Sequence, residues 1–113
     1  MKPYEGADSK LEFTEEIDGY RLTIWKNGTK RSKKYQWRTG YILLPKGHQL
    51  EGKDYDQDWA DEVVVHGGVT YADWEGDRWE IGFDCMHARD NIDTWTLEQV
   101  RAQLLRLLEQ VRA

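Results

Sequence analysis

The sequence has only one cysteine, Cys85, and no long run of apolar residues. A single cysteine cannot form an internal disulfide, so nothing in the chain indicates secretion. No stretch approaches the roughly 18 consecutive apolar residues that a membrane span needs. Residues 1–6 also contain no apolar signal core. We therefore expect a cytoplasmic protein that does not insert into a membrane.

The low mean hydropathy of -0.86 is typical of disordered proteins, but the aromatic content of the chain is not. Six Trp, six Tyr and two Phe supply large side chains whose burial stabilises a core. At 113 residues the chain is about one domain long. We expect a single globular domain over residues 1–113, in which residues 1–10 form a loose leader.

Charge is distributed unevenly along the chain, whose net charge is -5. Residues 21–50 carry eight Lys or Arg and no acid, whereas residues 51–84 carry eleven acids and two basic residues. The overall balance disfavours binding to duplex nucleic acid but allows a local anion site. The candidate anion contacts are Lys30, Arg31, Lys33, Lys34 and Arg38.

The patterns along the chain predict several strands. Residues 20–38 alternate as a basic hairpin around Asn27-Gly28, the strongest short signal for a tight turn. Residues 40–90 predict the rest of the sheet, with a long loop at 45–61. The strands expected there cover residues 41–44, 62–66, 69–71 and 79–83.

Residues 96–112 predict an amphipathic helix that begins with a capping box at 96–99. Its leucine-rich stripe would either cover the sheet or form the seam of a helix pair in a homo-oligomer. Together these elements predict an α+β fold. We expect an antiparallel sheet of about 5–6 strands packed against one C-terminal helix.

All three histidines and the cysteine lie within residues 48–87. One hypothesis is a zinc site of Cys85, His66, His87 and a carboxylate, although the usual ligand spacings are missing. Another is a nucleophilic Cys85 with His66 or His87 as its base. A third is a pocket in which imidazoles, carboxylates and aromatic rings contact a planar ligand. In a purely structural interpretation, both histidines bond to backbone groups at strand ends.

Four segments resemble a set of small phage and prophage proteins: LPKGH at 44–48, GKDY at 52–55, VHGGVTY at 65–71 and WEIGFDCMHARD at 79–90. Those proteins share the signature VHGGxTY…WxIGFDCxHxxD, and they tend to have glycine where this chain has Arg89. The resemblance implies a phage protein that counters host defence in the host cytoplasm. The matching residues are His48, His66, Gly67, Gly68, Thr70, Tyr71, Asp84, Cys85, His87 and Asp90.

Core packing requires apolar volume, so a motif of polar residues and glycine indicates a site. We expect a binding protein, without enzymatic activity, metal or cofactor, that sequesters a small anionic, nucleotide-like ligand. The candidate ligand contacts are His66, Thr70, Tyr71, Asp84, His87 and Asp90. Two alternatives stay open. One is an inhibitor that docks Asp54, Asp56, Asp58 and Asp61 on a basic host protein; the other is a small hydrolase or transferase that uses Cys85 and His87.

Overall fold

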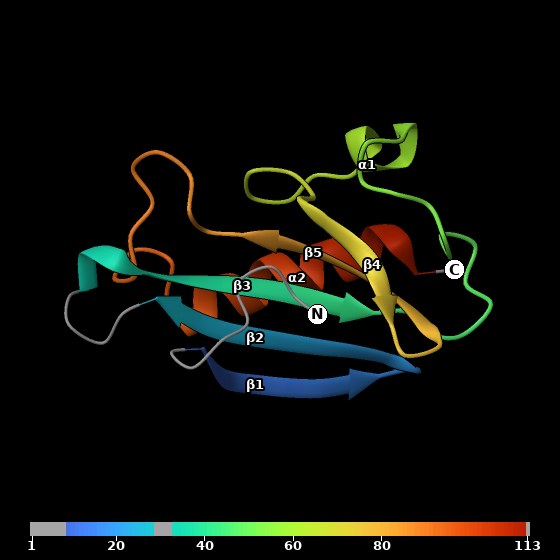
Figure 1. The fold of residues 1–113 in the computed structure, drawn as a ribbon, viewed down its shortest axis with the longest axis horizontal. Helices are drawn as coiled ribbons and strands as arrows, with labels where there is room; N and C mark the ends of the chain where they lie inside the picture. The colour runs from blue at the N-terminus through green and yellow to red at the C-terminus, as the bar shows by residue number, and fades with distance from the viewer. Residues whose placement is uncertain (1–8, 29–32, 113) are drawn as a thin grey trace.

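The computed structural model describes residues 9–28 and 33–112, and these form one antiparallel sheet with a long helix against it. The elements are β1 (Lys10–Ile17), β2 (Tyr20–Gly28), the 3-10 helix η1 (Lys33–Tyr35), β3 (Gln36–Leu43), α1 (Asp58–Glu62), β4 (Tyr71–Glu75), β5 (Arg78–Asp84) and α2 (Leu97–Val111). The strand order is β1-β2-β3-β5-β4 (Figure 1). The expected α+β fold, with an antiparallel sheet and one C-terminal helix, is confirmed.

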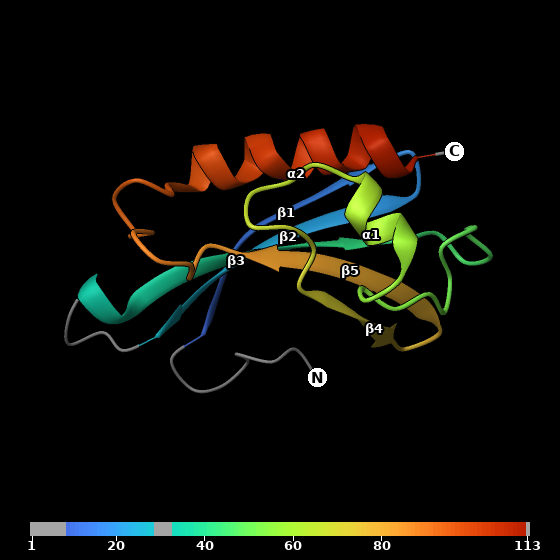
Figure 2. The ribbon, with the colours of Figure 1, turned by 90° about the horizontal axis from the view of Figure 1, so that it is seen from above.

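The core lies between α2 and one face of the sheet (Figure 2). Alternation along β2, β3 and β5 turns Leu22, Ile42 and Phe83 toward the helix, where all three are buried. Gly40 allows the helix to approach, because a Cβ there would lie 2.8 Å from the Phe83 ring and 3.1 Å from Leu104. Burial of this apolar surface is the main contribution that stabilises the fold. The buried residues of α2 are Val100, Leu104, Leu107, Leu108 and Val111.

Both ends of α2 are held by side chains. Thr96 is the N-cap, and its hydroxyl accepts a hydrogen bond of 3.3 Å from the backbone N–H of Gln99. At the other end, His48 Nε2 lies 2.9 Å from the carbonyl oxygen of Val111. The helix predicted from the stripe and the cap is therefore confirmed almost to the residue. No helix in the described part of the chain is long and apolar enough to cross a membrane.

The expected hairpin turn at Asn27-Gly28 is wrong. Both residues belong to β2, where they pair with Trp37 and Gln36 of β3. Asn27 is buried, and its side-chain amide donates to the Thr39 hydroxyl at 3.1 Å. Its polar group is therefore hydrogen-bonded inside the sheet and does not form a turn. The connection to β3 runs through residues 29–32, which are outside the described residues, and then through η1.

A strand before Tyr20 was not expected. β1 joins β2 through a two-residue turn at Asp18-Gly19, whose φ angles of 50° and 86° suit a tight hairpin. Lys10, expected in the leader, is the first residue of β1. The rest of the expected leader, apart from Ser9, lies outside the described residues.

The strand expected at 62–66 is also absent from the structure. The end of the expected loop forms α1 instead, and residues 63–68 then run as irregular chain alongside α2. Gln110 accepts from the backbone N–H of Val64 at 2.6 Å and donates to its carbonyl at 2.8 Å. Gln103 accepts from the backbone N–H of His66 at 2.9 Å. Helix side chains thus satisfy the backbone groups that a strand partner would otherwise satisfy. The strand expected at 69–71 begins only at Tyr71.

Candidate functional site

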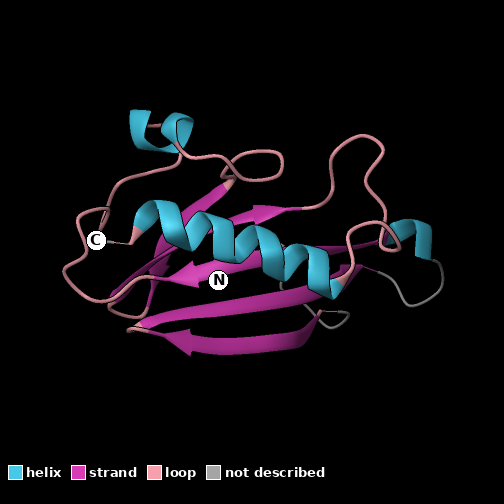
Figure 3. Cartoon of the chain, turned by 180° about the vertical axis from the view of Figure 1, so that it is seen from behind, coloured by secondary structure: helices cyan, strands magenta, loops and turns pink. Residues whose placement is uncertain are grey.

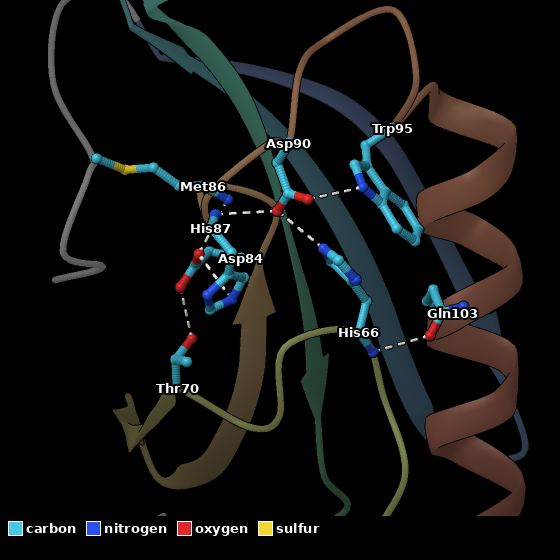
Figure 4. Close-up of polar contacts among 8 residues, drawn as sticks. All are labelled: His66, Thr70, Asp84, Met86, His87, Asp90, Trp95 and Gln103. Carbon is cyan, nitrogen blue, oxygen red and sulfur yellow. Dashed lines mark hydrogen bonds and ion pairs between the residues drawn. The ribbon is translucent and has the colours of Figure 1, made fainter.

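Residues 66–70 and 84–90, which are distant in sequence, meet at the end of β5 (Figure 4). Three observations establish this. His66 Nε2 lies 2.8 Å from Asp90 Oδ2. The Thr70 hydroxyl donates to Asp84 Oδ2 at 2.9 Å. The rings of His66 and His87 meet edge to face, with centroids 5.6 Å apart. The structure therefore brings together five of the six expected ligand contacts.

Asp90 is the centre of this cluster. Its Oδ2 accepts from the backbone N–H of His87 at 2.9 Å as well as lying against His66, and its Oδ1 accepts from Trp95 Nε1 at 3.0 Å. Burial is the largest single influence on this carboxyl and would raise its pKa. The hydrogen bonds from His66, His87 and Trp95, together with the charge of His66, outweigh burial and lower the pKa of Asp90. Asp90 is thus a carboxylate fixed in place by its donors.

His66 is held on two further sides. Its ring stacks on Trp95, with centroids 3.8 Å apart and an interplanar angle of 28°. Its backbone N–H donates to Gln103 of α2. Neither Trp95 nor Gln103 was singled out from the sequence. Trp95 directly precedes the N-cap Thr96, a position where an apolar side chain often packs back on a helix, and this was the only signal for it.

Asp84 and His87 form the second part of the cluster. Asp84 Oδ1 accepts from the backbone N–H of Met86 at 3.1 Å and lies 3.4 Å from His87 Nε2, without hydrogen-bond geometry. His87 Nε2 also lies against Gly67, where a Cβ would collide with the imidazole. Gly67 has a φ of 70°. Glycine is therefore required at this position both for its backbone conformation and for the close approach of His87.

A cavity of about 220 Å³ opens beside this cluster. One wall comes from η1 and the start of β3, and the other comes from the chain that follows β5. The cavity thus lies between the basic segment and the polar motif, which contributes Cys85, His87 and Asp90 to its wall. Its lining residues are Lys34, Tyr35, Gln36, Trp37, Cys85, Met86, His87 and Asp90.

The sixth expected contact, Tyr71, lies elsewhere. Tyr71 pairs in register with Gly82 and packs edge to face on Tyr41, with ring centroids 5.2 Å apart. It does not line the cavity. Burial, reinforced by nearby carboxylates, chiefly that of Glu80, raises the pKa of the Tyr71 phenol well above its usual value. His48, a motif residue that was not an expected contact, has a structural role, because it bonds to Val111 and accepts from the Leu50 backbone N–H at 3.0 Å.

The expected anion contacts lie in different surroundings. Lys34 lines the cavity, and its ammonium lies 5.6 Å from the centroid of the Tyr35 ring. Lys33 is exposed and reaches Asp93 at 3.5 Å. Arg38 is engaged by Glu12 at 2.7 Å and by two backbone carbonyls, so its guanidinium has a structural role. Lys30 and Arg31 lie outside the described residues.

Cys85 is only 2% exposed and belongs to the core. Burial, followed by the charges of Asp90 and Asp84, raises the pKa of its thiol to about 12. The thiolate that a nucleophile requires is therefore scarce at neutral pH. Among residues 9–28 and 33–112, no three His, Cys, Asp or Glu side chains are arranged to hold a metal ion. Comparison with family models, curated proteins and solved structures finds no match to this chain.

Proposed function

We propose that this protein binds a small, planar, anionic ligand of the nucleotide type in the cavity between η1 and the chain after β5. The observation that carries the proposal is the composition of the cavity, which combines aromatic rings with a lysine and an imidazole from separate parts of the chain. Tyr35 and Trp37 supply surfaces on which a base can stack. Lys34 and His87 supply donors for a phosphate or carboxylate.

The residues behind the cavity position those that line it. Asp90 holds the backbone of His87 through the 2.9 Å hydrogen bond to its N–H. His66 and Trp95 in turn hold Asp90 and offset its negative charge. An anion in the cavity would therefore meet a carboxylate whose oxygens are already occupied by three donors. His66, Thr70 and Asp84 support the site in this proposal, while His87 and Lys34 contact the ligand.

Binding without chemistry fits the site better than catalysis. The Cys85 thiol is buried with a raised pKa, and His66 is committed to Asp90. The cavity is smaller than the roughly 300–1,000 Å³ of pockets that enclose a drug-sized ligand. It would hold one ring or one charged group, and the remainder of a nucleotide would lie outside. The sequence resemblance to small phage proteins supports a counter-defence role, in which a nucleotide signal is sequestered in the host cytoplasm.

The test is isothermal titration calorimetry against cyclic dinucleotides, ADP-ribose and AMP. We expect one of these to bind, and Lys34→Gln to weaken that binding about five- to tenfold, since a charge contact to the ligand is lost. Lys46→Gln is the matched control, because Lys46 is exposed, pairs with Asp77 and does not line the cavity. Ligand released by heating the complex should be chemically unchanged. Absence of heat with every nucleotide at near-millimolar concentration, or an equal effect of both lysine variants, would overturn the proposal.

A further inference from the structure

A second cavity, of about 340 Å³, lies between α1 and the last turn of α2. Figure 3 places α1 beside the C-terminal end of α2, and Figure 1 places α1 and η1 toward opposite ends of the sheet. The apolar part of the lining comes from Leu50, Val63 and Val111. Trp59 forms another part of the wall, and Glu62 contributes a carboxylate. The site thus combines an apolar floor, an aromatic ring and a single acid.

These groups suit a side chain that is apolar along its length and cationic at its end. The Trp59 indole is fixed, because its Nε1 donates to the carbonyl oxygen of Asp54 at 2.8 Å. A fixed indole attracts a cation to its face, and Arg is the side chain most often found there. Glu62 is exposed and can pair with the charged group, while the apolar floor receives the methylene stem.

The charge around this cavity favours the same occupant. Residues 51–62 contain six acids and one base, Lys53. Asp56, Asp58 and Asp61 are exposed and form no ion pair within the described residues. A basic partner would therefore be attracted at long range and would not need to displace existing ion pairs.

Trp59 also lines a further cavity of about 320 Å³, together with Lys53, Gln57 and Asp58. Two hollows that share one aromatic ring can receive neighbouring side chains of an extended segment. A free amino acid or small amine would use only one of them. This arrangement favours a stretch of polypeptide over a small cation.

We propose that α1 and the two cavities lined by Trp59 form a docking site for a basic segment of a partner protein, with an arginine side chain between Trp59 and Glu62. This docking site shares no lining residue with the nucleotide cavity. The two proposals can therefore fail separately.

The probe is a fluorescein-labelled peptide of alternating glycine and arginine, with binding followed by fluorescence anisotropy at low salt. A peptide with citrulline in place of arginine has the same shape without the charge. We expect the arginine peptide to bind, the citrulline peptide not to bind, and Glu62→Gln to raise the Kd about tenfold. Glu98→Gln is the matched control, since it removes the same charge from an exposed position at the other end of α2 and should change the Kd less than about twofold.

Nuclear magnetic resonance on the unmodified protein provides a second readout that does not depend on any variant folding. The Trp59 indole N–H resonance should shift on addition of the arginine peptide, and the Trp95 indole resonance should not. Equal effects of Glu62→Gln and Glu98→Gln would indicate only a general attraction by net charge and would overturn the proposal. Binding of the citrulline peptide, or an unmoved Trp59 resonance, would overturn it as well.

Discussion

At the scale of single residues, Gly67 and Gly68 allow backbone strain to be separated from steric crowding. Both have positive φ angles, 70° and 80°, but a Cβ at Gly67 would collide with His87, whereas a Cβ at Gly68 would meet nothing within 4 Å. We expect Gly68→Ala to lower the free energy of unfolding by about 1 kcal/mol, the cost of a left-handed conformation for alanine. Gly67→Ala should cost about 2–4 kcal/mol, because His87 must also move.

Chemical denaturation of both variants measures the difference. The imidazole resonances of His87 should shift in Gly67→Ala and remain unchanged in Gly68→Ala. Equal destabilisation by the two substitutions would show that His87 does not pack against Gly67 in solution.

Arg89 has a φ of 72°, which is unfavourable for a residue with a side chain. Replacing it with glycine should relieve this strain, partly offset by the greater entropy of glycine in the unfolded chain. We expect Arg89→Gly to raise the free energy of unfolding by about 0.5–1 kcal/mol. Arg106→Gly, at an exposed position in the middle of α2, should instead lower the free energy of unfolding by about 1 kcal/mol. Denaturation curves that give the two variants the same sign would contradict the prediction.

Asp90 makes the stability of the folded protein depend on pH. Its pKa is lower in the folded protein than in the unfolded chain, so its contribution to stability is complete above the unfolded value of about 3.9 and is lost as pH falls below it. At neutral pH we expect Asp90→Asn to lower the free energy of unfolding by about 2–4 kcal/mol, since an amide cannot accept from all three donors.

Below pH of about 4 the difference between the wild type and this variant should shrink, because the Asp90 carboxyl of the unfolded wild-type chain takes up a proton more readily than that of the folded protein. Denaturation at a series of pH values provides the measurement. Asp93→Asn, at a largely exposed carboxyl nearby, is the matched control and should change the free energy of unfolding at neutral pH by less than about 0.5 kcal/mol. A gap between wild type and Asp90→Asn that stays constant down to low pH would be inconsistent with a lowered pKa.

At the scale of elements, side chains of α2 hold the segment that carries His66. Gln103→Ala leaves the partly buried backbone N–H of His66 without its acceptor, and we expect a loss of about 1–2 kcal/mol. Gln99→Ala is the control, because that side chain is exposed on the same helix. The variant at Gln103 should also shift the His66 imidazole resonances, which report the position of the ring over Trp95. If the resonances stay fixed, the segment is held by other contacts.

The elements that could be predicted from the sequence are those encoded by local patterns. α2 was predictable because an apolar stripe and the Thr96 cap lie within one stretch of chain. The segment around Val64 was not, because β-branched residues favour a strand and nothing local reveals that Gln110 will satisfy the backbone instead. The turn predicted at Asn27-Gly28 was wrong for a similar reason. An Asn-Gly pair usually marks a turn, but it is also compatible with a buried asparagine in a strand.

The site, like the fold, could be predicted only in part from the sequence. The proximity of His66 to Asp90 followed from grouping polar motif residues that a core does not need, and the structure places these residues in contact. Trp95 and Gln103 were missed because their roles depend on how α2 lies against the loop, which only the assembled fold specifies. Arg38 had the composition of an anion contact but became a bridge between β1 and the chain before α2.

At the scale of the whole molecule, stability is concentrated in the middle of the sheet. β2, β3 and β5 contribute fully buried residues to the core, and α2 covers them. α1 is different: it has five residues, only Ala60 is buried, and its N-cap Gln57 makes no side-chain capping bond. A helix this short is not stable by itself, so α1 depends on its contacts with the rest of the fold. The proposed docking site thus stands on a part of the molecule that is less stable than the middle of the sheet.

This difference predicts how the molecule opens. In native-state hydrogen exchange at increasing denaturant, we expect the amides of Ile24 and Ile42 to exchange only through global unfolding. The amides of Asp61 and Glu62 at the end of α1 should exchange through local opening, with a free energy lower by about 2 kcal/mol or more and almost independent of denaturant. Local opening would let α1 adjust around a docked basic segment, so the arginine peptide should slow exchange in α1. Because the peptide binds only the folded protein, it should also raise the free energy of global unfolding that Ile24 and Ile42 report. Exchange of α1 at the global rate would show instead that this helix is an integral part of the core, and a docking partner would then meet a rigid surface.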